Sequence, residues 1–364
     1  MTGDSTSVRR VLVLSPNWLG DAVMALPAIA DVRRRFRDAR LVVAARRAVA
    51  EMFTMVPGVD QVVALDWKGK LQQRRALRQD ITALRALEAD AALLLPNAFS
   101  AAWLVRRAGV RERWGYAADF RRPLLSRAVS RPRRSVHQAE YYQHLVRSLG
   151  IESGPLEPAL VVPDDAMVGA RTLLNSRNWS SSRPLIAIAP GAAYGTAKRW
   201  LPGHYASLLS SLVRAGAQCV LLGSAGDVET TDWIQQLVPD AQRRHVLDLT
   251  AVTTLSSLVG VIALARTFVS NDSGAMHVAA AVGTPVTALF GPTREYETRP
   301  LPRAGVRAEV LIHPVWCRPC MLRECPIDHR CMKGLSPDRV FATVRELMTD
   351  SPPGPQNRTR PTPS

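Results

Sequence analysis

The sequence predicts an α/β protein made of two doubly wound domains that face a ligand-binding cleft. Short apolar runs alternate with helical stretches along the whole chain, which is the pattern of parallel strands joined by crossover helices. The alternation is interrupted at Ile151–Asp165, a stretch rich in Pro and Gly, and it restarts after Arg183. The length of 364 residues, 47% of them hydrophobic, is sufficient for two medium-sized cores.

The first domain is expected to comprise residues 1–165. Its predicted strands are short apolar runs without polar alternation, as in a parallel sheet buried on both faces. A helix is predicted at Ala22–Phe36 and another at His137–Leu149, where Gly150 favours the helix end. The predicted strands are Val11–Leu14, Leu41–Ala44, Val62–Leu65 and Ala91–Leu95.

The second domain is expected to comprise residues 166–350. Its last helix is predicted at Ser336–Met348, with Ser336 as N-cap and Pro337 at the first helical position. The polar, Pro-rich residues 351–364 are expected to form a disordered tail. The predicted strands are Leu185–Ala189, Cys219–Leu222, Val246–Leu249, Thr267–Ser270 and Val286–Phe290.

The composition restricts the environment of the protein and its partners. Lys and Arg outnumber Asp and Glu by 47 to 31, which gives a formal net charge of +16. Such a charge attracts anions, whether nucleic acid, an anionic membrane or a phosphorylated substrate. Much of the excess lies in Arg-rich stretches of the chain, which form either an acceptor-binding surface or a solvated face. No apolar run approaches the roughly 20 residues of a membrane span, and Met1–Ser7 lacks the core of a secretory signal. We expect a cytoplasmic protein.

The first loop, Ser15–Asp21, follows the first strand. It lacks the G-x-G-x-x-G of a dinucleotide oxidoreductase, and the chain contains no G-x-x-x-x-G-K-[ST] of a P-loop nucleotidase. The loop does place the carboxylate of Asp21 at a helix N-terminus facing the predicted cleft. On its own, such an Asp is more often a helix cap than a catalytic base.

Three loops of the second domain are suited to a nucleotide diphosphate. In Pro190–Trp200, small residues allow backbone N–H groups to approach a ligand, while Lys198 and Arg199 supply positive charge. In Ser270–His277, a helix that opens near Ser273 offers free N–H groups and the positive end of its dipole. Asp272 and, in Gly223–Asp227, Asp227 are candidates for binding sugar hydroxyls.

Taken together, these motifs resemble glycosyltransferase family 9, and within it most of all the type II lipopolysaccharide heptosyltransferases. The resemblance implies a GT-B fold, in which two Rossmann-like domains face a cleft. It also implies ADP-L-glycero-D-manno-heptose as donor and a heptosyl-Kdo-lipid A core as acceptor. The matching segments are SPNWLGDAVMALPA (15–28), LLPNAFSAA (94–102), PGAAYGTAKRW (190–200), LLGSAGD (221–227) and SNDSGAMHVAAAVGTPVTALFGPT (270–293).

The resemblance implies roles for single residues. The residue matching Asp21 is the proposed base of related enzymes, the one matching Lys198 binds the diphosphate, and those matching Asp272, Ser273 and Gly274 hold the donor. Further donor contacts are expected from Gly191, Thr196, Arg199, Asp227 and His277, and acceptor contacts from Asn17, Trp18, Gly20 and Asn97. We expect a monomer that meets its anionic acceptor at the cytoplasmic face of the inner membrane.

Transfer with inversion requires a base on one face of the sugar and positive charge at the leaving diphosphate on the other. The chain has no D-x-D pair, the usual metal-holding motif of the other large transferase fold. Lys198, Arg199 and a helix N-terminus can supply the charge instead, so no metal cofactor is expected to be required for catalysis.

Four of the five cysteines are clustered, at Cys317, Cys320, Cys325 and Cys331, with His313 and His329 nearby. A structural zinc ion, a reversible disulfide pair and reduced thiols all fit this spacing, and we rank structural zinc first.

Two alternatives have a different substrate or a different function. A family 9 transferase could use another donor sugar or a different core acceptor. A basic RNA-binding protein would need an aromatic recognition module, but aromatic residues are only 6% of the chain and no such module is recognisable. An inactive scaffold is disfavoured by the intact Asp21, Lys198 and Asp272. We therefore expect no nucleic-acid partner.

Overall fold

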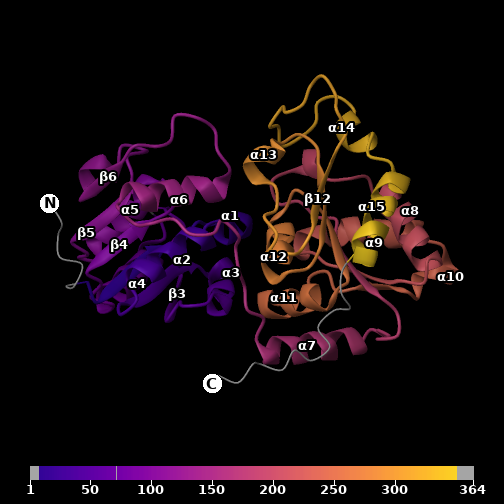
Figure 1. The fold of residues 1–364 in the computed structure, drawn as a ribbon, viewed down its shortest axis with the longest axis horizontal. Coiled ribbons are helices and arrows are strands. Elements are labelled where there is room, and N and C mark those ends of the chain that lie inside the picture. The colour runs from indigo at the N-terminus through magenta and orange to yellow at the C-terminus, as the bar shows by residue number, and fades with distance from the viewer. Residues whose placement is uncertain (1–7, 71, 351–364) are drawn as a thin grey trace. The chain divides into compact units, whose positions relative to one another are not determined.

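The computed structural model describes residues 8–70 and 72–350. The expectations for Met1–Ser7 and for a disordered tail at 351–364 lie outside these residues. Contacts divide the chain into two compact units, the first ending at Val161 and the second beginning at Val162. Each unit has its own parallel sheet and its own covering helices (Figure 1).

The sheet of the first unit has the strand order β3-β2-β1-β4-β5-β6, and all its pairings are parallel. The four predicted strands are confirmed, whereas β5 and β6 were missed because their sequences, ERWGY and RAV, are not apolar runs. The strands are β1 (Arg10–Leu14), β2 (Arg40–Arg46), β3 (Gln61–Leu65), β4 (Ala91–Leu94), β5 (Glu112–Tyr116) and β6 (Arg127–Val129).

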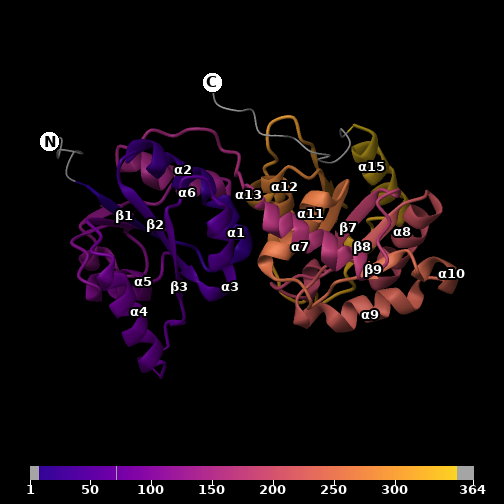
Figure 2. The same cartoon turned by 90° about the horizontal axis from the view of Figure 1, so that it is seen from below.

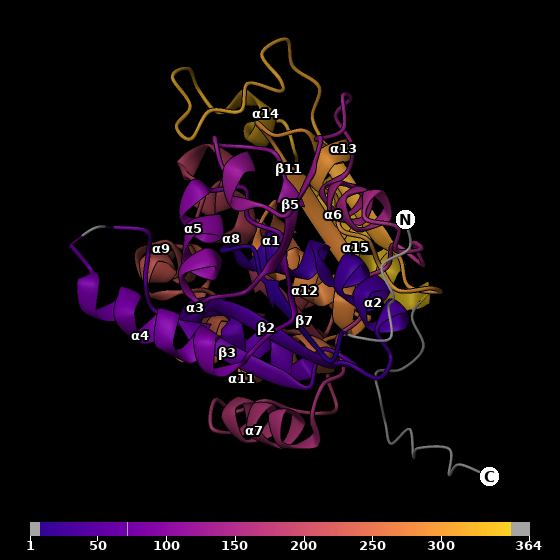
Figure 3. The ribbon, with the colours of Figure 1, turned by 90° about the vertical axis from the view of Figure 1, so that its left-hand side faces the viewer.

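Helices cover both faces of this sheet. Figure 3 shows α2 (Leu26–Arg35) and α6 (Gln138–Ser148) on one side of the strands, with α4 (Arg74–Ala86) and α5 (Phe99–Arg107) on the other. The prediction of one helix at Ala22–Phe36 was wrong. Two helices, α1 (Leu19–Met24) and α2, meet at Ala25, because Pro27 fits the first turn of a new helix and not the interior of a continuous one. The remaining short elements are α3 (Arg47–Ala50), η2 (Glu51–Met55) and η3 (Arg122–Leu124).

The sheet of the second unit has the order β12-β11-β10-β7-β8-β9, again with parallel pairings throughout. The five predicted strands are confirmed. The edge strand β12 was missed, since its sequence AEVLI contains a charge and only one of its residues is buried. The strands are β7 (Leu185–Ala189), β8 (Gln218–Leu221), β9 (Val246–Asp248), β10 (Thr267–Asn271), β11 (Val286–Phe290) and β12 (Ala308–Ile312).

Two helical layers enclose the second sheet. The apolar core on one face joins the strands to α8 (Pro202–Arg214), α9 (Val228–Leu237) and α15 (Pro337–Asp350). Figure 2 shows α7 (Asp164–Asn175), α11 (Leu255–Leu264) and α12 (Gly274–Val282) on the opposite face. Asp164 and Asp165, expected in the linker, form instead the first turn of α7. The short elements are η4 (Thr196–Lys198), η5 (Ala225–Asp227), α10 (Asp240–Arg243), α13 (Glu295–Thr298) and α14 (Arg330–Lys333).

Both sheets place their first and fourth strands side by side, β1 with β4 and β7 with β10. The chain leaves each pair toward helices on opposite faces of the sheet. In doubly wound folds, ligands bind at the carboxyl ends of such a strand pair, where the two connections diverge. The fold therefore identifies the loops after β1 and β4, and after β7 and β10, as candidate binding regions.

Candidate functional site

The centre of the second unit's candidate site is a buried ion pair. The Lys198 ammonium lies 2.5 Å from Oδ2 of Asp272, and the two side chains are only 13% and 6% exposed. Asp272 follows β10, whereas Lys198 ends η4 in the connection after β7. The hydroxyl of Thr293 donates to the same carboxylate oxygen at 2.7 Å. A buried charge requires such partners, and this arrangement holds the lysine beside the start of α12.

The aromatic ring of Tyr194 also holds Lys198. The ammonium nitrogen lies 4.7 Å from the ring centroid, a cation–π contact. The Tyr194 hydroxyl donates to the carbonyl of Met321 at 2.8 Å, which ties the ring to a distant segment. Lys198 is therefore oriented from two sides, by a carboxylate and by a ring.

Asn271, the last residue of β10, connects the two loops of the site. Its side chain is fully buried. The amide nitrogen donates to Pro190 O at 2.6 Å, while the amide oxygen accepts from the backbone N–H of Trp200 at 3.0 Å. Both ends of the Pro190–Trp200 loop are thereby fixed to the strand that leads into Asp272.

Arg199 and Asp227 form a second charged contact at 3.8 Å. Asp227 is mainly a capping residue, because its Oδ2 accepts from the backbone N–H and the hydroxyl of Ser224 at 2.9 and 2.7 Å. Gly191 lies against this carboxylate, and a Cβ there would be 2.3 Å from Asp227 Oδ1. The buried Nε of Arg199 has no hydrogen-bond partner among the described residues.

The N-terminus of α12 presents backbone donors next to Asp272. Ser273 is the N-cap residue and its side chain makes no capping hydrogen bond to the helix; its hydroxyl pairs with that of Ser270 instead. The first N–H groups of the helix, which begins at Gly274, are thus not capped by that side chain. His277, one turn further on, is buried, and Thr196 at the start of η4 is exposed. The expected donor residues thus lie around the ends of β7, β8 and β10.

In the first unit, Asp21 is the third residue of α1, whereas the N-cap position belongs to Trp18. Asp21 is partly exposed. Burial, followed by the negative charge of Asp21, raises the pKa of the Tyr142 hydroxyl well above its ordinary value. The carboxylate therefore lies in the first helical turn, close enough to Tyr142 of α6 to act on it electrostatically.

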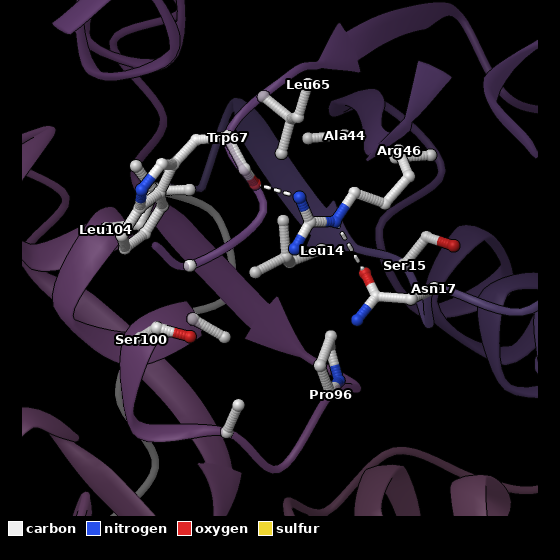
Figure 4. Close-up of a pocket in the computed structure, with 14 residues that line it drawn as sticks. Leu14, Ser15, Asn17, Ala44, Arg46, Leu65, Trp67, Pro96, Ser100 and Leu104 are labelled. Atoms are coloured by element: carbon white, nitrogen blue, oxygen red, sulfur yellow. Dashed lines mark hydrogen bonds between the residues drawn. The ribbon is translucent and has the colours of Figure 1, made fainter. Parts of the chain in front are cut away.

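A pocket opens at the carboxyl ends of β1, β2 and β3 (Figure 4). Its empty volume is about 430 Å³, including its open mouth. The guanidinium of Arg46 crosses it, donating from Nε to Asn17 Oδ1 at 3.0 Å and from Nη1 to the carbonyl of Trp67. Burial lowers the pKa of Arg46. The pocket is therefore lined mainly by apolar side chains, and Arg46 and Asn17 supply a positive charge and an amide group.

Asn97 belongs to a polar network beyond the end of β4. Its amide nitrogen donates to the Tyr141 hydroxyl at 2.9 Å, and Arg121 Nη2 lies 3.5 Å from its amide oxygen. Arg121 is fully buried, donates to the carbonyls of Pro96 and Tyr116, and has its pKa lowered by burial to about 10. The network fixes the orientation of the Asn97 side chain.

Large aromatic side chains are exposed just beyond the strand ends at the same edge of the first sheet. Trp18 after β1, Phe99 after β4 and Phe120 after β5 are 62%, 47% and 96% exposed. Gly20, within the first turn of α1, lies beside Asp21. The carboxyl ends of parallel strands meet at one edge, so these rings and the pocket share that edge.

The four clustered cysteines do not form a metal site in this structure. Burial, followed by the charges of Cys317, Cys325 and Cys320, raises the pKa of the Cys331 thiol. All are free thiols. Across residues 8–70 and 72–350, however, no group of three or more His, Cys, Asp or Glu side chains is arranged to hold a metal ion. The structural-zinc hypothesis is therefore not supported by the arrangement of these side chains.

Several residues of the site were missed in the sequence. Thr293 and Asn271 lie within segment 270–293, which carries the family resemblance. Their position in that segment could have identified them as residues of the site. Tyr194 lies within segment 190–200, which carries the same resemblance. Arg46 and Arg121 were missed because the contacts that place them in the site are made to residues distant in the chain. Within its described part, the chain has no helix that is long and apolar enough to cross a membrane.

Comparisons with known proteins agree with this fold. The profile of glycosyltransferase family 9 (heptosyltransferase) matches residues 74–330. Lipopolysaccharide heptosyltransferase 2 of Salmonella typhimurium is 32% identical over 306 residues, covering 80% of this chain and 85% of that protein. The structure of E. coli ADP-heptose lps heptosyltransferase II superimposes with a TM-score of 0.81 at 29% identity, over 93% and 98% of the two chains. A family 9 glycosyl transferase from Veillonella parvula has a TM-score of 0.82 at 18% identity, over 94% and 98%, and shares the fold.

Proposed function

This chain belongs to glycosyltransferase family 9, and from that membership we propose that it transfers a heptose from ADP-heptose to the inner core of lipopolysaccharide. The similarity to a protein named lipopolysaccharide heptosyltransferase 2 and to the structure of ADP-heptose lps heptosyltransferase II supports both the donor and the acceptor. The single observation that carries the proposal is the Lys198–Asp272 pair beside the N-terminus of α12.

The second unit binds the donor in this proposal. The Lys198 ammonium and the first N–H groups of α12 bind the diphosphate, and Arg199 adds a charge at the edge of the site. Asp272 holds Lys198 in place and accepts from a sugar hydroxyl. These groups stabilise the charge that develops as ADP leaves, so catalysis does not require a metal ion to neutralise it.

The first unit binds the acceptor and supplies the base. Asp21 removes the proton from the attacking hydroxyl while ADP departs from the opposite face of the heptose, which inverts the anomeric configuration. Asn17, Trp18, Gly20 and Asn97 contact the acceptor in this proposal, and the Arg46 pocket adds positive charge for its anionic groups. The acceptor carries one heptose already, as in the type II enzymes that the first loop resembles.

The acceptor is a lipid-linked molecule, and we extend the proposal to a monomer that contacts the cytoplasmic face of the inner membrane. Exposed Trp18, Phe99 and Phe120, together with the net charge of +16, suit an anionic bilayer surface. Co-sedimentation with anionic but not neutral vesicles is the expected result.

Mass spectrometry of the product tests the reaction directly. The purified protein is incubated with ADP-heptose and a set of defined truncated cores. We expect the mass of one heptose to be added to the core that already carries one heptose, and to no shorter core. Addition to the heptose-free core would identify a different acceptor position. Transfer only from another nucleotide sugar would identify a different donor.

A further inference from the structure

The cysteine-rich segment, residues 313–334, packs directly against the loops of the donor site. Its backbone accepts two hydrogen bonds from the Pro190–Trp200 loop, one from the Tyr194 hydroxyl to Met321 O at 2.8 Å and one from Ala197 N to Arg323 O at 2.9 Å. A Cβ on Gly195 would lie 2.2 Å from Arg323 O, so the two backbones are in close contact there.

The same segment is anchored to the loop after β11. Met321 N donates to Pro292 O at 2.9 Å. Arg318 donates from Nε to Gly291 O at 2.7 Å and from Nη2 to Thr293 O at 3.1 Å. Thr293 is the residue whose hydroxyl binds Asp272. The segment therefore contacts two loops next to the Lys198–Asp272 pair: the loop that carries Lys198 and the loop that carries Thr293.

The side chain of Arg323 adds a second cation to the Tyr194 ring. Its guanidinium carbon lies 5.2 Å from the ring centroid, and the Lys198 ammonium lies 4.7 Å from the same centroid. The Tyr194 ring therefore has one cation that is paired with Asp272 and a second cation, Arg323, within reach of the same site.

Arg323 differs from the other arginines of its segment in its partners. Arg318 pairs with Glu295 at 2.8 Å and Arg330 with Asp328 at 3.0 Å. Arg323 forms no ion pair with any residue in the ranges 8–70 and 72–350, and its side chain is exposed. Its charge is therefore not paired with a carboxylate in the described residues, and it lies on the same aromatic ring as the lysine proposed to bind the donor.

We propose that Arg323 is a further binding residue of the donor site, whose guanidinium contacts the diphosphate of the nucleotide together with Lys198. The inference rests on the proposed function, because it assigns Arg323 to the same ligand. A guanidinium can donate two parallel hydrogen bonds to phosphate oxygens, which the point charge of a lysine cannot do. The cysteine-rich segment then positions Arg323 at the donor site.

Calorimetric titration with ADP and with adenosine, which lacks the diphosphate, tests the proposal. We expect Arg323→Gln to bind ADP about tenfold more weakly and adenosine as well as the parent does, since only a contact to phosphate is lost. Arg323→Lys should recover only part of the ADP affinity, because it restores the positive charge but not the two parallel hydrogen bonds. The matched control is Arg330→Gln, on the same segment but paired with Asp328, and it should bind both ligands like the parent.

The outcomes separate this inference from the function on which it rests. Unchanged ADP affinity in Arg323→Gln, with a clear loss in Lys198→Ala, would overturn the role of Arg323 and leave the proposed function intact. An equal loss of ADP and adenosine in Arg323→Gln would show a displaced segment and no phosphate contact, which also overturns it. Absence of ADP binding by the parent protein would overturn both.

Discussion

At the scale of single residues, the central distinction is between side chains that cap or pair and side chains that react. Asp21 and Asp227 both lie in the first turn of a helical element. Asp227 completes a capping box with Ser224, so its main role is accounted for within the fold. Asp21 is the third residue of α1, beyond the N-cap residue Trp18. A catalytic role for Asp21 is thus compatible with a stable helix start.

The base role of Asp21 is tested by a change of one atom. Asn can still accept hydrogen bonds from helix N–H groups but cannot take a proton near neutral pH. We expect Asp21→Asn to keep the melting temperature within a few degrees and to keep ADP binding, while turnover falls by roughly two to four orders of magnitude. The control is Asp164→Asn, in the first turn of α7, which should leave turnover unchanged. Retention of more than about a tenth of the activity by Asp21→Asn would assign the proton to another group.

Lys198 is expected to stabilise the leaving diphosphate. Lys198→Ala should raise the free energy of the transition state by about 2–4 kcal/mol, measured as the decrease in kcat/KM for ADP-heptose. The variant should fold, because Lys198 is the last residue of the short element η4 and Asp272 keeps its hydrogen bond from Thr293. Lys333→Ala removes one charge from an exposed position and serves as the control. Near-parental turnover of Lys198→Ala would exclude the lysine from the site.

At the scale of elements, we expect donor binding to depend on the beginning of α12. The helix follows directly after β10, so that its first N–H groups point from the same edge of the sheet as Asp272. Backbone donors of this kind bind phosphate only if no bulky side chain blocks them. Phosphate binding at this helix therefore requires a small residue at position 274, where the helix begins.

Gly274→Val should therefore reduce ADP affinity while the affinity for a truncated core acceptor stays unchanged. Both affinities are measured by calorimetry on the same preparation. Gly203→Val is a matched control, since Gly203 is in the first turn of α8 and a Cβ there meets no atom within 4 Å. An equal decrease in both affinities would indicate a folding defect and not a blocked phosphate site.

At the scale of the whole molecule, the proposed reaction is divided between the two units. The residues expected to bind the donor, from Gly191 to His277, all lie after Val162, whereas Asp21 and the expected acceptor residues lie before Val161. Each unit has its own sheet and its own buried core, which packs around β1 and β4 in the first unit and around β7 and β8 in the second. Donor binding and proton removal are therefore separable properties.

This separation predicts the behaviour of a fragment that begins at Val162. The fragment should fold, because its core does not depend on residues of the first unit. We expect it to bind ADP within a few-fold of the affinity of the whole chain and to transfer no heptose. A folded fragment, verified by circular dichroism, that fails to bind ADP would show that the first unit contributes donor contacts.

The sequence by itself determined the fold class, nine of the twelve strands in the described residues, and the loops after β1, β7 and β10 in which the expected site residues lie. These features depend on local patterns, namely apolar runs, loop residues after strands and contiguous motifs. The strands that were missed, β5, β6 and β12, include charged residues and two edge positions, where burial is incomplete and the apolar pattern is weak. The break between α1 and α2 was also missed, although Pro27 was its local signal.

Only the tertiary structure decided which of these residues are partners. Lys198 and Asp272 are 74 positions apart, and the contact between Tyr194 and Met321 spans 127. Such pairs form because β7 and β10 are neighbours in the sheet and because residues 313–334 return to the same loops. Strand order and the return of a distant segment are set by the packing of the whole core, and no local run of residues encodes them.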